Sequence, residues 1–176
     1  IEGVDAATPV AVEMLRLGHD NNSEYVVVAG VVAQEGVTVF GADTGHLTPG
    51  DPHYANGTYA GPWTGEMVVS PATAELLSLE AADSLSVAGD ERRFAVSRVG
   101  AADVESGAGS LPTAVAHLSE VQTLSGQTEA DAADQILVQT NDPGVKDALE
   151  DIYPHSEVVS RSGTGLSSVA NSDLSL

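Results

Sequence analysis

The sequence predicts an α+β domain, with a mixed sheet and short helices on one side of it. Apolar runs typical of strands occur along much of the chain. Two short strands are followed by a capping side chain and a proline, Ser70-Pro71 and Asp142-Pro143, which favour a helix start. The last third alternates strand and helix patterns. No apolar run approaches the roughly 20 residues that a membrane helix needs.

The first predicted unit is a long hairpin. Val10, Val12 and Met14 alternate with smaller or charged neighbours, which is the period of a strand. A turn-rich stretch at 18–23 then leads into the apolar run 25–32, the second strand.

A short strand over Val37 to Phe40 leads into an irregular segment, Gly41 to Gly65. This segment is rich in Gly, Pro, Asp, Asn and Thr and has no periodicity. Loops of this length in compact domains are usually functional or mobile, so we expect a contact surface here. It would form the irregular, β-rich extension of the domain, at about 33–66.

After the irregular segment, the sequence again predicts regular elements: a strand, a helix and two more strands. Met67 to Val69 reads as a strand, and Ser70-Pro71 starts a helix that runs to about Leu77. Leu85 to Val87 and Phe94 to Val99 are the next strands. A flexible Gly/Ala/Ser stretch is expected over 100–110.

The last third begins with an extended stretch over Thr113 to Ala116. Ser119 is predicted to cap a short helix, because Gln122 follows at capping-box spacing. Gly126 stands where the helix needs a left-handed residue to end.

The next strand is predicted over Ile136 to Gln139 and the last over Glu157 to Ser160. Between them, Val145, Leu149 and Ile152 lie on one face of a helix that Pro154 ends. Residues 161–176 turn to Ser, Gly and Asn and predict a weak helix or a linker.

The charge balance is the most unusual property of the chain. Among 176 residues, 26 are acidic and 6 are basic, which gives a formal net charge of −20. Such a surface repels itself where screening reaches only about 10 Å, and concentrated salt relieves that repulsion. The composition therefore indicates a halophilic protein. The carboxylates are spread evenly, which favours a dispersed solvated face over a specific acidic function such as DNA mimicry.

The same composition excludes several classes of protein. Five arginines and one lysine cannot supply the basic footprint that nucleic-acid binding needs. The chain has no cysteine, which excludes disulfide scaffolds, zinc ribbons and cysteine nucleophiles.

Five histidines raise the question of a metal site. The densest group of potential ligands is Asp43, His46, Asp51 and His53 in the irregular segment, but its spacing matches no established ligand pattern. The sequence therefore predicts no metal site, and it leaves open whether these four residues bind an ion. The remaining histidines are predicted at the surface: His19, His117 and His155.

No catalytic or cofactor-binding residue is predicted. No serine lies in G-x-S-x-G, and Pro71 marks Ser70 as a helix cap rather than a nucleophile. The glycine pairs at 107–109 and 163–165 lack the lysine or the six-residue pattern of phosphate loops. Asn21 and Asn56 begin glycosylation triplets in predicted loops.

The stretch from Met67 to Val87, closed by Phe94-Ala95-Val96, resembles the core domain of MacB/FtsX-type ABC transporter permeases. That family has a strand ending in a Ser-Pro-type cap, a helix, a turn ending in Gly-Asp, and two strands. Three further stretches resemble its opening strand, its strand-helix unit and its next strand: 2–10, 111–122 and 136–138.

This sequence departs from the family pattern at two positions. The family's Gly before the Asp is Ala82 here, and Ser78 stands where another Gly is common. Alanine accepts a positive φ poorly, so the sequence leaves the geometry of this turn open.

The resemblance implies a single extracytoplasmic domain, 1–176, with two lobes as an alternative, about 33–66 and the remainder. In the family this domain lies between the first and second membrane helices, so 161–176 would be a linker toward a membrane helix. It implies a non-catalytic domain on the extracellular face of the cell membrane, without cofactors, which couples ATP-driven motions to export or to an extracellular partner.

The implied partners are the permease's own membrane helices, an ABC ATPase subunit, a second permease copy and an outside partner or cargo. Two other functions remain open from the sequence. One is a free-standing secreted binding or adhesion domain of a halophile, and the other is an acid-rich hydrolase.

Overall fold

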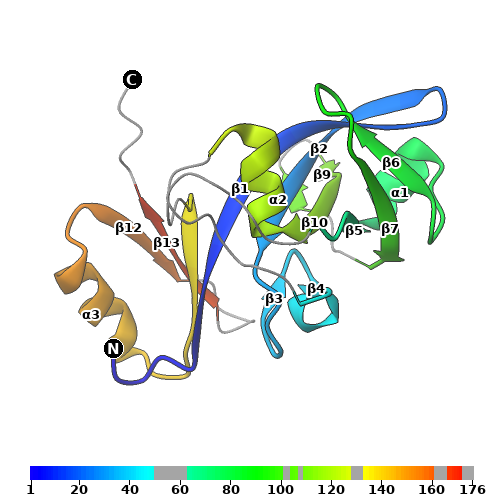
Figure 1. Ribbon diagram of the computed structural model, residues 1–176. Coiled ribbons are helices and arrows are strands. Elements are labelled where there is room, and N and C mark those ends of the chain that lie inside the picture. The colour runs from blue at the N-terminus through cyan, green and yellow to red at the C-terminus, as the bar shows by residue number, and fades with distance from the viewer. Residues whose placement is uncertain (50–62, 101–103, 107–108, 128–132, 161–165, 172–176) are drawn as a thin grey trace. The chain divides into compact units, whose positions relative to one another are not determined.

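The computed structural model in Figure 1 describes residues 1–49, 63–100, 104–106, 109–127, 133–160 and 166–171. The chain divides into two compact units. One comprises Ile1–Val10 and Ala133–Leu176, and the other comprises Ala11–Ala132. These bounds differ from the two lobes considered above. No helix within the described ranges is long and apolar enough to cross a membrane.

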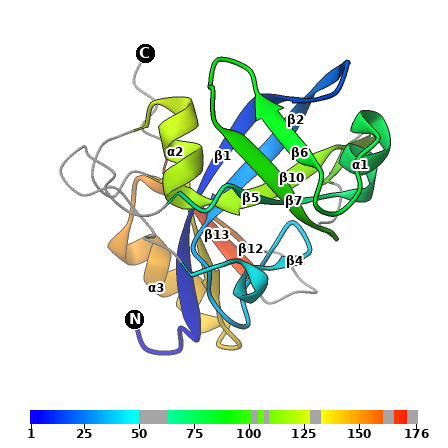
Figure 2. The same cartoon turned by 45° about the vertical axis from the view of Figure 1, so that its right-hand side comes forward.

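The 11–132 unit is built on a ring of strands. Hydrogen-bonded neighbours follow the order β1 (Ala6–His19), β2 (Asn22–Val31), β10 (Thr113–His117), β5 (Glu66–Val69), β7 (Arg93–Val99) and β6 (Ser84–Val87). Strand β6 then pairs with β1, at Leu17↔Val87 and Gly18↔Ser86, so the ring closes (Figure 2). Closure leaves no free edge. The ring mixes parallel pairs, β2 with β10 and β5 with β7, with antiparallel ones.

The mixed sheet, together with the three α-helices found in the described ranges, confirms the predicted α+β class. The predicted strands at 67–69, 85–87, 94–99, 113–116 and 136–139 are present within one residue of their expected bounds. The closing pair between β6 and β1 was not predicted, because a pairing between residues 70 positions apart leaves no mark in local periodicity.

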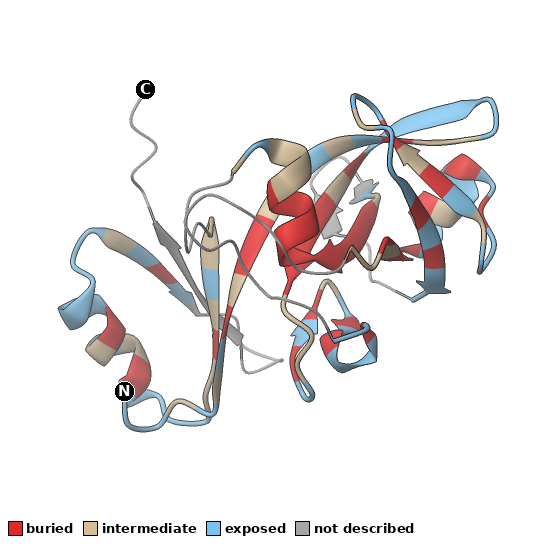
Figure 3. Cartoon of the chain, in the orientation of Figure 1, coloured by how far each residue is buried: buried red, intermediate tan, exposed pale blue. Residues whose placement is uncertain are grey.

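The interior of this ring is apolar. Its largest fully buried side chains include Leu17, Met67, Leu85 and Phe94. Figure 3 colours the chain by burial, with buried residues in red. Helix α2 (Leu118–Ser125) contacts β2, where Gly30 leaves room for Val121. A Cβ on Gly30 would lie 2.7 Å from the Val121 Cβ, so this close approach requires glycine.

Helix α1 (Pro71–Leu77) begins as predicted. Ser70 Oγ accepts a hydrogen bond from the Thr73 amide at 3.2 Å, and Pro71 occupies the first helical position. Ser70 also accepts from the Thr113 amide at 3.1 Å, which fastens the helix start to β10.

The turn after α1 is left-handed at both positions where the family often has glycine. Ser78 has φ +56° and Ala82 has φ +74°. The Ala82 amide donates to the Val96 carbonyl at 2.7 Å, and the Val96 amide donates to Asp83 O at 2.9 Å. These bonds hold the turn against β7, so the chain adopts the backbone that glycine would favour without having glycine there.

Helix α2 corrects one predicted boundary. It begins at Leu118 with His117 as its N-cap, and Ser119 lies inside the helix rather than capping it. Gly126 ends the helix in the left-handed conformation, φ +77°, as predicted. The capping-box spacing of Ser119 and Gln122 was misleading because β10 runs directly into the helix.

The segments predicted as irregular hold some regular structure. Strands β3 (Thr38–Val39) and β4 (Ala42–Asp43) pair, and a 3₁₀ turn, η1 (Thr44–His46), follows. The stretch predicted as flexible over 100–110 contains β8 (Val104–Ser106) and β9 (Gly109–Leu111), which form an antiparallel pair.

The other unit has its own small core. Its strands follow the order β12 (Ser156–Ser160), β13 (Leu166–Asn171), β11 (Gln135–Gln139) and the start of β1. Helix α3 (Gly144–Ile152) contacts β12 and contributes Val145 and Leu149 to a cluster with Val138 and Val158.

Two predictions for this unit were wrong. Residues 166–171 are a strand that pairs with both β11 and β12, whereas a weak helix or linker was expected. Ile152 is 54% exposed, so only Val145 and Leu149 of the predicted apolar face are buried. The predicted start of α3 is also shifted: the helix begins at Gly144 with Pro143 in the cap position, although Asp142 Oδ1 still accepts from the Gly144 amide at 2.8 Å.

We expect Ala82→Gly to stabilise the domain. Relief of a left-handed alanine is worth about 1 kcal/mol, more than the extra backbone entropy that glycine loses on folding. Ala81→Gly is the matched control, because Ala81 is an exposed neighbour whose φ is not positive, and it should destabilise. Urea unfolding of the two variants measures both; a loss of stability in Ala82→Gly would contradict the strained turn.

Candidate functional site

The predicted metal group is only partly within the described residues. Asp43 Oδ2 lies 3.6 Å from His46 Nε2, and Asp43 Oδ1 accepts from the Gly45 amide, which caps η1. Asp51 and His53 lie outside the described residues. In the ranges that the structure describes, no three His, Cys, Asp or Glu side chains are placed to hold a metal ion.

Two of the three histidines predicted at the surface are largely buried. His19 has 16% of its side chain exposed; its Nε2 lies 3.6 Å from both Asp20 and Asp83, and its Nδ1 lies 3.0 Å from Ser84 O. His117 is 5% exposed, at the end of β10. Only His155 is exposed as predicted.

Ser70 serves as a cap. It is fully buried and its Oγ is occupied by the amides of Thr73 and Thr113, with Thr73 Oγ1 at 3.1 Å. A nucleophile needs an adjacent base, and the described partners of Ser70 are backbone amides and a threonine. The local contacts support the interpretation of Ser70 as a structural residue.

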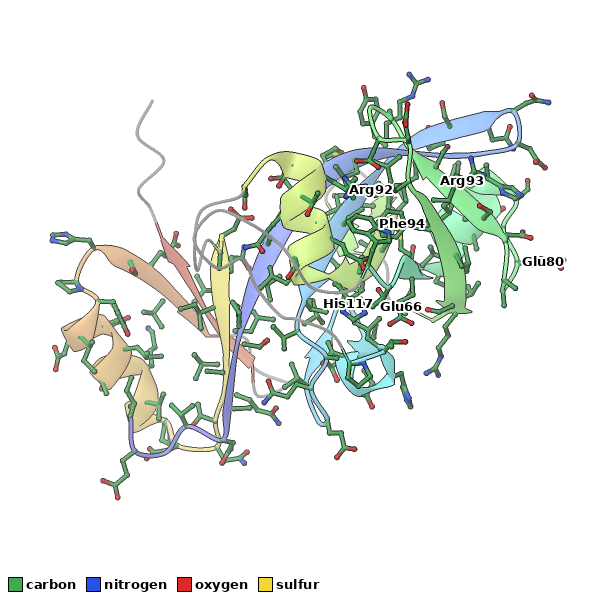
Figure 4. All side chains as sticks on the ribbon, in the orientation of Figure 1. Glu66, Glu80, Arg92, Arg93, Phe94 and His117 are labelled. Carbon is green, nitrogen blue, oxygen red and sulfur yellow. The ribbon has the colours of Figure 1, made fainter. Side chains whose placement is uncertain are left out.

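The polar site that the sequence missed lies where β10 meets α2. His117 Nε2 lies 2.8 Å from Glu66 Oε1, a close pair between β10 and the first residue of β5 (Figure 4). The Thr48 amide donates to the same carboxylate oxygen. Glu66 therefore binds both a buried imidazole and the backbone of the irregular segment.

A second carboxylate holds the other end of that segment. Glu120 lies in the first turn of α2 and is fully buried. Its Oε1 accepts hydrogen bonds from the Thr64 amide, from Thr64 Oγ1 at 2.8 Å and from the Gly65 amide at 3.1 Å. Glu66 and Glu120, the anchoring carboxylates, thus fix the chain at Thr48 and again at Thr64 and Gly65.

An aromatic cluster begins at Trp63, the residue before Thr64. Trp63 packs edge-on against Phe94, with ring centroids 5.3 Å apart, and the Arg92 guanidinium lies 4.1 Å from the Trp63 ring centroid. Arg92 also pairs with Asp90 in the turn between β6 and β7. The hydrogen bonds from Arg92 lower the pKa of Asp90 to about 2.

The contacts at this site hold chain segments together. The described hydrogen bonds of the two anchoring carboxylates are with backbone amides, a threonine hydroxyl and His117. Three donors on one oxygen of Glu120 supply part of the stabilisation that a buried carboxylate needs. The arrangement fixes the ends of residues 48–64 on the strand ring.

Sequence patterns do not distinguish these two carboxylates from the others. In a chain with 26 acidic residues, Glu66 and Glu120 look like all the others, and the interpretation of the carboxylates as a solvated face is wrong for these two. The one available signal was Trp63, the only tryptophan, at the end of the irregular segment.

Comparisons with known proteins give a likeness at the level of structure. No family model and no curated protein sequence matches the chain. The extracellular domain of the noncanonic ABC-type transporter YknZ from Gram-positive bacteria is 15% identical, with 88% of this chain and 79% of that chain covered and a TM-score of 0.48.

A domain of a putative permease protein from Porphyromonas gingivalis is 11% identical, with 97% of this chain and 74% of that chain covered and the same TM-score, 0.48. Both solved structures come from permeases or transporters, and neither likeness by itself assigns a function to this chain.

We expect Glu120→Ala to destabilise the domain by about 3 kcal/mol, because three hydrogen-bond donors lose their acceptor. Glu120→Gln keeps one carbonyl oxygen and should cost less. Urea unfolding measures the loss, and hydrogen exchange at the Thr64 and Gly65 amides should quicken in Glu120→Ala. Glu75→Ala, an exposed residue of α1, is the control and should change stability by less than about 0.5 kcal/mol. Unchanged hydrogen exchange at the Thr64 amide in Glu120→Ala would contradict the role of Glu120 in holding this segment.

Proposed function

We propose that this chain is the extracytoplasmic domain of a MacB/FtsX-type ABC transporter permease. It performs no chemistry and couples ATP-driven motions to export or to an extracellular partner. The observation that carries the proposal is the backbone of residues 67–96.

That segment has each part that the resemblance implies, in the implied order. Strand β5 ends at the Ser70-Pro71 cap, α1 follows, and a turn leads to β6 and β7. Ser78 and Ala82 replace residues that are commonly glycine in the family, and both adopt the positive φ that glycine favours. A side chain disfavours a positive φ, so neither serine nor alanine would select this conformation by itself. The positive φ at both positions therefore supports the alignment with the family more strongly than the order of strands does.

A mechanical role is also supported by the anchoring carboxylates. Carboxylates hold the chain at Thr48 and again at Thr64: the Thr48 amide donates to Glu66, which is partly buried, and Thr64 donates to Glu120, which is fully buried. A contact segment on a fixed base can transmit displacement to and from the ring. We therefore retain Gly41 to Gly65 as the proposed contact surface.

In this proposal the domain lies on the extracellular face of the cell membrane. Its partners are the permease's own membrane helices, an ABC ATPase subunit, a second permease copy and an extracellular partner or cargo. The cargo is not assigned.

The gene that encodes the chain tests this proposal. We expect one apolar stretch of about 20 residues upstream of Ile1 and three after Leu176, each long enough to cross a membrane. Sequencing the flanking DNA gives the answer. A signal peptide before Ile1 with a stop codon after Leu176 would instead support the free-standing secreted binding domain.

The halophilic origin is a separate proposal that rests on the net charge of −20. We expect the midpoint of thermal unfolding to rise steeply from dilute buffer to molar KCl, because salt screens the repulsion between carboxylates. Circular dichroism at increasing KCl measures it, with choline chloride at equal ionic strength to separate screening from specific potassium binding. A midpoint independent of salt would contradict this origin.

A further inference from the structure

One outer face of the strand ring differs from the rest of this acidic chain. It is formed by neighbouring parts of β2, β1, β6 and β7 within the 11–132 unit. We call it the arginine face and define it by its outward residues, which are Met14, Arg16, Gly18, Ser23, Tyr25, Ser84, Ser86, Arg93 and Ala95. None of these residues is acidic.

The burial of the strands fixes which side chains point outward. Leu15 and Leu17 pack into or against the core, so Met14 and Arg16 lie on the opposite side of β1. Phe94 and Val96 are buried, so Arg93 and Ala95 point outward on β7. The register joins the strands, because Gly18 pairs with Ser86 and Ser86 pairs with Arg93.

Strand β2 extends the same face. Arg16 Nε donates to Ser23 Oγ at 3.0 Å, so the two side chains lie on one side of the hairpin. Tyr25 is two residues from Ser23 on β2 and therefore shares its side. From strand spacing and rise, the Cα atoms of Arg16 and Arg93 lie about 12 Å apart.

Serine side chains hold both arginines. Arg93 Nε donates to Ser84 Oγ at 2.9 Å, as Arg16 does to Ser23. In the part of the chain that the structure describes, neither guanidinium forms an ion pair, whereas Arg92 pairs with Asp90 and Lys146 with Glu150. Arg98 also forms no ion pair among the described residues, so what distinguishes Arg16 and Arg93 is that they share one face without carboxylates. The Arg16 bond uses Nε and leaves its terminal nitrogens for an outside acceptor, whereas Arg93 also donates one terminal nitrogen to Ser84 O, at the long distance of 3.4 Å.

The apolar residues of this face are also unusual. Tyr25 is 63% exposed and Met14 is 59% exposed, the highest values for any large apolar side chain among the described residues. Tyr, Met and Arg are the residue types that interfaces select, and acidic residues are depleted from interface centres. Exposure of these types together, on a face without carboxylates, favours binding to a protein.

We propose that the arginine face binds an acidic partner protein. Arg16 and Arg93 would donate hydrogen bonds to its carboxylates, and Met14 and Tyr25 would pack against apolar side chains of the partner beside them. Charge complementarity supports this occupant, because a guanidinium with free donors binds a carboxylate through two hydrogen bonds. Elsewhere the surface of this chain would repel an acidic partner, so the face would also set the orientation of binding. The inference does not depend on the permease assignment.

The test uses a synthetic probe and the domain itself, at the lowest KCl concentration at which the domain is folded. The probe is a capped six-residue peptide of alternating Glu and Leu, and its control alternates Gln and Leu. Amide chemical shifts are followed by NMR during titration. We expect saturable shifts confined to β1, β2, β6 and β7, and about tenfold weaker binding of the Gln-Leu peptide.

Single substitutions separate this face from net charge. Arg16→Ser and Arg93→Ser should each weaken binding about fivefold, by loss of one charge-assisted contact. Tyr25→Ser should also weaken it. Lys146→Ser removes one positive charge from α3, outside the face, and should leave binding unchanged. Because all four side chains are partly or largely exposed, circular dichroism should show each variant folded.

Three outcomes would overturn the proposal. They are shifts that are absent or lie outside the four strands, equal binding of the two peptides, and equal effects of Arg93→Ser and Lys146→Ser. Sedimentation of the domain without peptide gives one further test. A dimer that dissociates in Arg93→Ser would assign the face to a second copy of this chain, and the proposal of an acidic partner would then be wrong.

Discussion

The pairing of β6 with β1 is the constraint on which the rest of the 11–132 unit depends. Leu17↔Val87 and Gly18↔Ser86 close the strand ring, and closure removes the two edges that an open six-stranded sheet would expose. It also places Leu17 and Val87 in one interior with Phe94. The left-handed turn at Ala82 comes directly before β6, and its hydrogen bonds to Val96 of β7 hold the chain where β6 begins.

Much of the fold could be predicted because its signals are local. The Ser70 cap with Pro71, the left-handed Gly126 and the Val145 and Leu149 face of α3 each follow from residues a few positions apart. The failures are also local in cause. Ser119 looked like a cap because capping boxes are read from spacing alone, while the extended His117 at the end of β10 had already begun the helix.

The polar site could not be predicted for a different reason. Whether a glutamate is buried depends on what the fold brings to it, and Glu120 meets Thr64 across 56 residues of sequence. The acid-rich composition hid this residue, since its surroundings in the sequence resemble those of exposed carboxylates. The arginine face could not be predicted either, because only the pairing of β1, β6 and β7 places Arg16 and Arg93 on one side of the ring.

Strand β1 belongs to both compact units, and this has a thermodynamic consequence. Its residues 6–10 pair with β11, and its later residues hydrogen-bond to β6 in the ring. The two pairings use different residues of β1, and the backbone runs without a break from one to the other, so unfolding of one unit frees a chain end directly beside the paired residues of the other. A truncation that removes the residues up to Val10 would leave the ring pairs at Leu17 and Gly18 in place, but it would take from β11 its β1 partner and so expose an edge that invites aggregation.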